Sequence, residues 1–218
     1  MGERRSRFAE RVERVASRLV ARPAFWIVFL LAAGIWPLVR PLAHPPSPRL
    51  PVLASLPAFE LTDQRGLPFG LHDLQGRVWV ASFIFTRCET VCPAITAKMK
   101  QVQDRGRQLG SEFHLVSFSV DPDHDTPERL AAYARQHGAS PRLWSFLTGP
   151  AEAVKAAVSD GLKISIGREG GGPEGVSHGT HLVLVDGQGR VRGYYDPADP
   201  GVVDRVVRDV GLVVNRGG

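Results

Sequence analysis

Hydrophobic residues in this chain gather into short, uninterrupted runs separated by turns. Residues 78–85 form an apolar run rich in β-forming side chains, which is typical of a strand buried on both faces. Residues 113–120 form a second apolar run that also predicts a strand. The segments between and after these runs are interpreted as helices, at 93–109, from residue 127 onward, at 151–158 and at 202–210.

Turn signals complete the predicted fold. The turn Asp63-Gln64-Arg65-Gly66 predicts a β-hairpin over 59–69. A short strand is expected at 143–147, and Asp186-Gly187-Gln188-Gly189 indicates a hairpin between strands at 181–185 and 191–195. Asp125 or Thr126 is the expected N-cap of the helix that begins at Pro127. The order strand, helix, strand, helix, then a hairpin and a last helix predicts an α/β fold whose sheet is covered on its faces.

The first 57 residues have a different character from the rest of the chain. Residues 23–39 are uncharged and mostly apolar, with tryptophans near both ends, and we predict a single transmembrane anchor of minimal length. A cleaved signal peptide is the alternative. The basic arm at 1–22 places the N-terminus in the cytoplasm and the following chain outside it. Residues 40–57 contain six prolines and predict an extended tether, so that 58–213 forms the folded domain.

The positive charge of the chain comes from its N-terminal part. Of the formal net charge of +5, seven arginines and three glutamates in residues 1–22 supply +4, and Arg40 and Arg49 supply another +2. The part from Leu50 onward therefore carries −1. A folded domain without excess positive charge gives little support to nucleic-acid binding.

Cys88 and Cys92 are the only cysteines in the sequence, and they form a C-x-x-x-C motif between a predicted strand and a predicted helix. If the helix begins within the motif, both thiols project from one side of its first turn, where they could form a disulfide or bind one metal ion. The helix N-terminus and Arg87 favour the thiolate, a soft ligand suited to Cu(I). Two buried, inert cysteines are the simpler alternative, and the pair alone does not separate metal binding from redox chemistry.

The order of elements resembles the thioredoxin fold, and residues 50–212 resemble more narrowly the Sco/SenC family of membrane-anchored copper proteins that serve cytochrome c oxidase assembly. Three stretches carry the resemblance. They are Phe85-Thr86-Arg87-Cys88 through Cys92-Pro93, similar to F-T-x-C-x-x-x-C-P; Ser119 through Pro127, similar to S-x-D-P-x-x-D-T; and Val176-Ser177-His178, similar to V-x-H. The family often has proline after the first cysteine, where this chain has Glu89, a departure that bears on the redox potential more than on the metal site.

The resemblance implies that Cys88, Cys92 and His178 are copper ligands. Two thiolates and one imidazole can hold Cu(I) in a trigonal site, and the same set tolerates Cu(II). His178 follows the glycine-rich segment 168–175, which we expect to be a flexible loop that brings the ligand toward the cysteines.

Three further residues near these motifs could act at the metal site or could have an ordinary structural role. His181 is a weaker candidate ligand, because it would face away from His178 if the strand already begins at 178. His124 lies in the Asp-Pro loop and is interpreted as a solvated loop residue. Asp121 is a possible hydrogen-bond partner behind the metal ligands, or it merely ends a strand and turns the chain.

These observations lead to a functional hypothesis. The family resemblance implies a copper chaperone, not an enzyme with turnover, whose partner is a cytochrome c oxidase subunit with a CuA-type site. We expect it in the bacterial inner membrane as a single-pass protein, with the C-terminal domain in the periplasm or outside the cell. The alternative is a thiol–disulfide oxidoreductase that uses Cys88 and Cys92 as a redox pair to reduce the cysteines of an oxidase subunit or another extracytoplasmic partner.

Overall fold

The computed structural model describes residues 50–164, 166–168, 176–178 and 181–215, and in the N-terminal part Pro23, Trp26, Ile27, Gly34 and residues 29–31. The chain divides into two compact units, Met1–Pro48 and Arg49–Gly218. The predicted basic arm, most of the predicted anchor and the first part of the predicted tether lie outside the described residues. Among the residues that are described, no helix has the length and hydrophobicity needed to cross a bilayer.

An eight-stranded mixed sheet forms the centre of the unit Arg49–Gly218, with the strand order β1-β10-β9-β4-β5-β6-β2-β3. Its middle strands are β4 (Val78–Ile84), β5 (Phe113–Ser119) and β6 (Trp144–Thr148), which run parallel to one another. Every residue of these three strands is buried, as expected for strands that are covered on both faces. The remaining strands pair antiparallel: β2 (Glu60–Asp63), β3 (Pro68–Gly70), β9 (Leu182–Val185), β10 (Arg190–Tyr195) and β1 (Ala54–Ser55).

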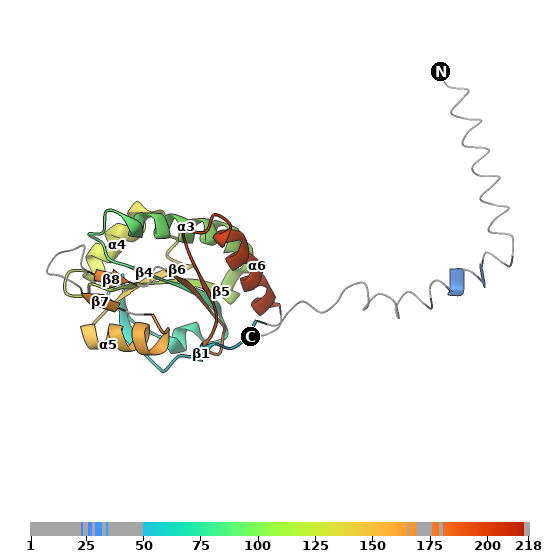
Figure 1. Ribbon diagram of the computed structural model, residues 1–218, viewed down its shortest axis with the longest axis horizontal. Helices are drawn as coiled ribbons and strands as arrows, with labels where there is room; N and C mark the ends of the chain where they lie inside the picture. The colour runs from blue at the N-terminus through green and yellow to red at the C-terminus, as the bar shows by residue number, and fades with distance from the viewer. Residues whose placement is uncertain are drawn as a thin grey trace, which may run out of the picture. The chain divides into compact units, whose positions relative to one another are not determined.

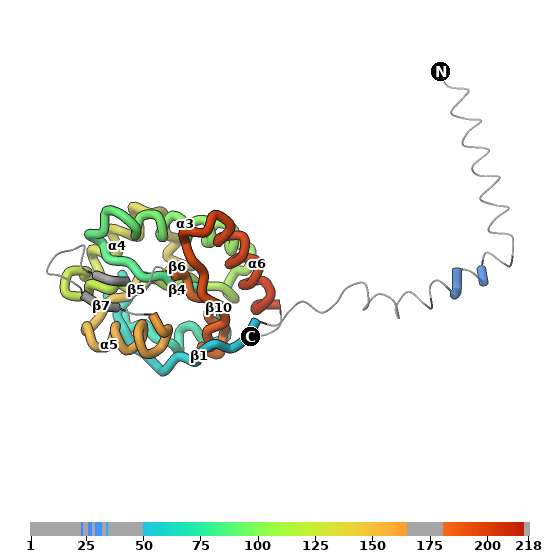
Figure 2. Tube along the Cα trace, viewed as in Figure 1, coloured from blue at the N-terminus to red at the C-terminus, as the bar shows by residue number. Residues whose placement is uncertain are grey.

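Helices cover the two faces of the sheet. Figure 1 shows α3 (Val91–Gly106), α4 (Pro127–Gln136) and α6 (Val202–Val214) above the sheet and α5 (Ala151–Lys155) below it. In Figures 1 and 2, α3 and α6 lie side by side, and the two helices contact each other. Shorter helical segments are the 3-10 helices η1 (Leu71–Leu74) and η2 (Arg107–Glu112) and the π-helical segment η3 (Ala156–Gly161). The predicted α/β class with an N-terminal β-hairpin is confirmed.

Three strands were not predicted. β1 lies in the last part of the predicted tether, where Ala54 pairs with Val191 of β10, so this part of the tether belongs to the domain. β7 (Ile166–Arg168) and β8 (Val176–His178) form a separate two-stranded antiparallel sheet. Strands of two or three residues carry almost no hydrophobic pattern of their own, because they are stabilised by the strand with which they pair.

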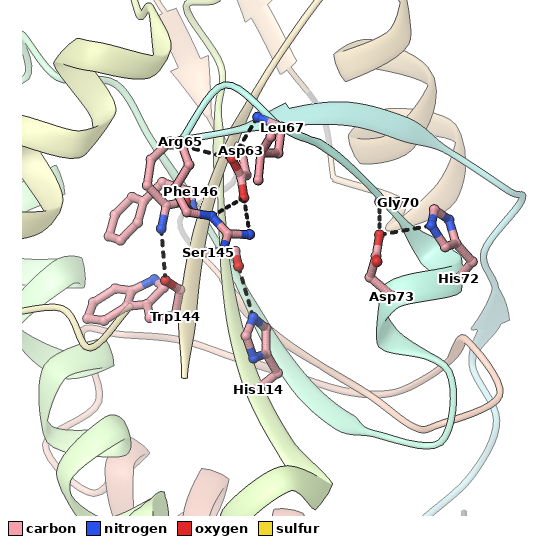
Figure 3. A network of polar contacts seen from close by, with 11 residues as sticks. Asp63, Arg65, Leu67, Gly70, His72, Asp73, His114, Trp144, Ser145 and Phe146 are labelled. Carbon is pink, nitrogen blue, oxygen red and sulfur yellow. Dashed lines mark hydrogen bonds and ion pairs between the residues drawn. The ribbon is translucent and has the colours of Figure 1, made fainter. Parts of the chain in front are cut away.

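A buried polar network lies in the edge hairpin and the neighbouring central strands (Figure 3). Asp63 is fully buried and accepts hydrogen bonds from the amides of Arg65 at 2.8 Å and Leu67 at 3.0 Å. His114 of β5 contacts Ser145 of β6, with 3.0 Å between Nε2 and Oγ. Most of these buried polar atoms have hydrogen-bond partners within the domain, so we interpret the network as a structural support of the sheet.

Candidate metal and redox site

The two cysteines lie where the central strand β4 ends and helix α3 begins. Phe85 follows the strand and stays buried, and Cys88 comes three residues before the helix starts at Val91. Cys92 is the second residue of the helix. The helix therefore begins inside the C-x-x-x-C motif, two residues earlier than predicted, and this brings both thiols to the same helix end.

The sulfur of Cys88 takes the place of a helix cap. Thr90, the N-cap residue, makes no side-chain cap bond, and the amide of Cys92 instead donates a hydrogen bond to Cys88 Sγ at 3.4 Å. The hydroxyl Oγ1 of Thr90 lies 3.8 Å from the same sulfur. Both cysteines are free thiols, with Cys88 7% exposed and Cys92 fully buried. Helix amides and a hydroxyl directed at one sulfur stabilise negative charge there.

The two thiols consequently differ in acidity. Burial is the largest influence on Cys88 and opposes its ionisation, but hydrogen bonds from Cys92 and Thr90 together outweigh it, so the pKa of Cys88 lies below its usual value. Burial raises the pKa of Cys92, and its hydrogen bond to Cys88 and the negative charges of Cys88 and Asp125 raise this pKa further. The pair thus combines a slightly exposed thiol whose pKa is lowered with a buried thiol that stays protonated.

Asp121 lies beside the motif and binds Arg87. The Asp121 carboxylate is fully buried, and its Oδ2 accepts a hydrogen bond from Nε of Arg87 at 2.7 Å and forms an ion pair with Nη2, also at 2.7 Å. This contact places Asp121 behind the residue that precedes Cys88, while a direct role toward a metal ligand stays a prediction. Arg87, which was expected from the sequence to favour the Cys88 thiolate, is not among the largest influences on the pKa of Cys88, and its guanidinium is paired with the Asp121 carboxylate.

Asp125 is a second buried carboxylate that supports the loop, and sequence reasoning considered it only as a helix cap. Its two oxygens accept the Thr86 amide at 3.3 and 3.1 Å, one of them accepts the Thr86 hydroxyl at 2.5 Å, and the other accepts the Ser119 hydroxyl at 2.6 Å. The helix cap is Thr126, whose hydroxyl accepts the amide of Arg129. The second acid of the S-x-D-P-x-x-D-T motif was the sequence signal that could have identified it.

Tyr133 on α4 is another residue near the thiols that sequence reasoning missed. Its phenol forms a hydrogen bond of 2.8 Å with Oγ1 of Thr96, which lies one turn after Cys92 on α3, and both residues are buried. Burial raises the pKa of Tyr133 to about 12, although the bond to Thr96 acts the other way, and the charges of Cys92 and Cys88 add to the increase. The phenol therefore stays protonated beside the thiols. No sequence pattern separates it from an ordinary core tyrosine.

The three candidate histidines are placed differently. His178 is the last residue of β8, where its backbone pairs with Ile166, but its side chain lies outside what the structure describes. His178 as the third ligand therefore stays a prediction. His181 is exposed and precedes β9, outside the strand that ends at His178. Nδ1 of His124 lies 3.0 Å from a guanidinium nitrogen of Arg129. Among the described side chains, no three histidines, cysteines or acids are grouped so as to hold a metal ion.

The fold and the site together define a class of protein: a thioredoxin-like domain with a reduced C-x-x-x-C pair at the end of a central strand. Residues 52–211 match the SCO1/SenC family model, and the chain belongs to the SCO1/SenC family. The SCO1 protein homolog of Bacillus subtilis is 32% identical over 184 residues, which cover 84% of this chain and 90% of that relative. The predicted family resemblance is confirmed.

Solved structures share the fold, which confirms its thioredoxin-like architecture. A SCO1/SenC family lipoprotein from Bacillus anthracis is 36% identical with a TM-score of 0.69, covering 76% of this chain and 98% of its own. BsSco, a member of the Sco family of cytochrome c oxidase assembly proteins in which a disulfide switch was identified, is 30% identical with a TM-score of 0.68, covering 77% of this chain and 98% of its own. ScoI from Bradyrhizobium japonicum, a structure with copper bound, has the same fold at 20% identity and a TM-score of 0.63, covering 73% of this chain and 99% of its own.

Proposed function

We propose that this chain binds copper through Cys88, Cys92 and His178 and delivers it to the CuA-type site of a cytochrome c oxidase subunit. The observation that carries the proposal is the pair of free thiols at the start of α3, with the Cys92 amide bonded to the Cys88 sulfur at 3.4 Å. Membership of a family that includes a copper-bound structure and oxidase assembly proteins supports the choice of cargo.

The two thiolates and the imidazole supply a soft, three-coordinate donor set for Cu(I) that also accepts Cu(II). Cys92 must lose its proton to bind the cargo, because its raised pKa keeps the thiol protonated at neutral pH. Copper binding therefore releases a proton from Cys92, and the apparent affinity rises with pH. Asp125 and Asp121, through Thr86 and Arg87, hold the loop that presents Cys88.

Copper titration of the reduced full-length chain in detergent tests the proposal. We expect one copper per chain, with Cys88 and Cys92 both required. His178→Ala should weaken the site and change its Cu(II) spectrum, whereas the matched variant His124→Ala should leave the spectrum nearly unchanged. A parental spectrum in His178→Ala would remove that residue from the ligand set and favour His181 instead.

A second candidate function is the reduction of a disulfide on a partner protein, and the unequal acidity of the thiols favours it. The Cys88 thiolate would attack one sulfur of the partner's disulfide, form a mixed disulfide and release one partner thiolate. Cys92 would then lose its proton and attack Cys88 Sγ, which releases the second partner thiolate. The partner gains two electrons as two thiols, and Cys88 and Cys92 become a disulfide.

Membrane attachment is the third part of the proposal. The uncharged segment 23–39 would form a single-pass anchor in the inner membrane, and the seven arginines of the arm at 1–22 would keep the N-terminus in the cytoplasm. The thiols would then lie in the periplasm or outside the cell.

A further inference from the structure

A cavity of about 610 Å³ lies where the central strands β4, β5 and β6 begin, and the cysteines follow the other end of β4. Arg77, Arg107 and Arg142 line it, and they come from the three segments that lead into β4, β5 and β6. Because these three strands are parallel, their first residues share one edge of the sheet, and the Cys88 loop follows the far end of β4. A strand of seven residues separates the two ends by roughly 20 Å.

The positive charge of this cavity is largely unbalanced. No aspartate or glutamate is among its lining residues. Within the part of the chain that the structure describes, Arg77 and Arg142 form no ion pair with a carboxylate. Arg107 pairs with Asp104 at 3.0 Å, but Lys100 contacts the same carboxylate at 2.6 Å. Several arginines elsewhere in the domain have buried carboxylate partners, as Arg87 has in Asp121 and Arg190 has in Asp186.

The cavity combines this charge with an apolar surface. Leu143, which is partly exposed, lines it beside the buried ring of Phe113, together with the hydroxyl-bearing residues Ser111 and Ser140. Its volume is within the range of pockets that bind small molecules, roughly 300–1,000 Å³. A single inorganic ion leaves most of this space unfilled, so the lining favours an anion that carries an apolar group.

We propose that this cavity binds a phosphate group attached to an apolar body, from either a soluble organic phosphate or the headgroup of an anionic lipid. Each guanidinium presents a planar fork of donors, and a phosphate offers oxygens on several sides. Three guanidiniums from three separate segments therefore suit a phosphate dianion better than a carboxylate, which has only two oxygens. Leu143 would contact the apolar part.

Isothermal titration calorimetry at constant ionic strength tests the proposal on the copper-free, full-length chain in a nonionic detergent. The probes are phenyl phosphate, phenylacetate, and the short-chain lipids dihexanoyl phosphatidylglycerol and dihexanoyl phosphatidylcholine. We expect saturable binding of phenyl phosphate, of the phosphatidylglycerol, or of both, and binding of phenylacetate that is at least about tenfold weaker.

Matched double variants distinguish a specific binding site from general electrostatic attraction between the protein and an anion. Arg77→Gln/Arg142→Gln should weaken phosphate binding about tenfold or more, whereas Arg105→Gln/Arg205→Gln, which removes two guanidiniums paired with aspartates outside the cavity, should change it by less than about twofold. Both variants should load copper as the parent does, which confirms their fold.

The outcomes test the proposal and show whether the phosphate belongs to a soluble molecule or to a lipid. Binding of phenyl phosphate alone identifies a soluble ligand, and binding of the phosphatidylglycerol alone identifies a lipid headgroup. The proposal is overturned if no probe binds saturably, if phenylacetate or the zwitterionic lipid is the preferred ligand, or if both double variants lose affinity equally.

Discussion

The carboxylate of Asp125 accepts hydrogen bonds from both the amide and the hydroxyl of Thr86, two residues before Cys88 and 39 residues away from Asp125 in the sequence. Asp125 is fully buried, and it also accepts a hydrogen bond from the hydroxyl of Ser119 at 2.6 Å. Its hydrogen-bond donors are thus an amide and two hydroxyls, whereas the neighbouring carboxylate of Asp121 is paired with the guanidinium of Arg87. The position of the Cys88 loop therefore depends on a buried carboxylate that accepts hydrogen bonds from Thr86 and Ser119.

Asp125→Ala should destabilise the reduced, copper-free protein by roughly 2–4 kcal/mol, because it leaves the partly buried amide of Thr86 and two hydroxyls without their acceptor. Asp125→Asn keeps one acceptor oxygen and the shape of the side chain, so the loss should be smaller. Chemical denaturation gives both values, and Glu112→Ala at an exposed site is the control, with an expected change under about 0.5 kcal/mol. Equal midpoints for Asp125→Ala and the control would show that the loop does not need this carboxylate.

Cys88 should react with iodoacetamide well before Cys92 at pH 7. Its pKa is lowered and it is 7% exposed, whereas the pKa of Cys92 is raised and its side chain is fully buried. Mass spectrometry of timed samples should show Cys92→Ser modified readily and Cys88→Ser modified at least about tenfold more slowly. Similar rates for the two single-cysteine variants would contradict the assigned asymmetry.

His114 should make the domain less stable in mild acid. Burial, followed by the positive charges of Arg77 and Arg65, lowers the pKa of His114 from 6.5 to about 4 in the folded state. Between these pH values the unfolded chain binds more protons than the folded one, so the free energy of unfolding should fall by roughly 3 kcal/mol as the pH drops from 6.5 to 4.

Denaturation at several pH values measures this effect of His114. His114→Phe keeps a ring beside Phe69 and cannot titrate, so its stability should depend less on pH than that of the parent. His181→Phe, at an exposed position, should retain the parental slope. If His114→Phe also keeps that slope, the acid sensitivity comes from other groups.

The His178→Ala variant should separate copper delivery from disulfide reduction. Disulfide exchange needs an attacking thiolate and a resolving thiol but no imidazole ligand, so the variant should keep most of its ability to reduce a model disulfide. It should lose oxidase assembly in cells at limiting copper. Oxidase activity in a strain that carries only this variant, at a verified protein level, is the measurement. Full activity at low copper would favour the reductase, and loss of both activities would indicate that His178 supports the thiols or the fold.

The cysteines should be accessible from outside the cytoplasm if the segment 23–39 is an anchor with the predicted orientation. A membrane-impermeant thiol reagent should label Cys88 in intact cells, or in spheroplasts where an outer membrane blocks access. Cytoplasmic proteins with known thiols serve as the internal control for lysis. Labelling that appears only after the inner membrane is broken would rule out this topology.

Much of the fold and part of the site could be predicted because they depend on local patterns. Uninterrupted apolar runs predicted β4 and β5 almost to their ends, and Pro127 after two capping residues predicted the start of α4. The short strands β1, β7 and β8 were missed, since strands of two or three residues carry almost no hydrophobic pattern of their own, and β1 in addition pairs with the distant strand β10. The C-x-x-x-C motif identified both thiols, because its spacing and the helix start lie within a few residues of each other.

The sequence by itself determined the order of the elements, the α/β class and the two cysteines, whereas only the tertiary structure decided how the site around them is built. Arg87 meets Asp121 across 34 residues and Thr86 meets Asp125 across 39, and the largest influences on the pKa of Cys88 are burial and the hydrogen bonds from Cys92 and Thr90. The arginines of the cavity come together only because β4, β5 and β6 are parallel and begin at one edge. Hydrophobic patterning is a property of neighbouring residues, but the charge that a side chain experiences is set by strand register and burial, which arise only when distant segments pack.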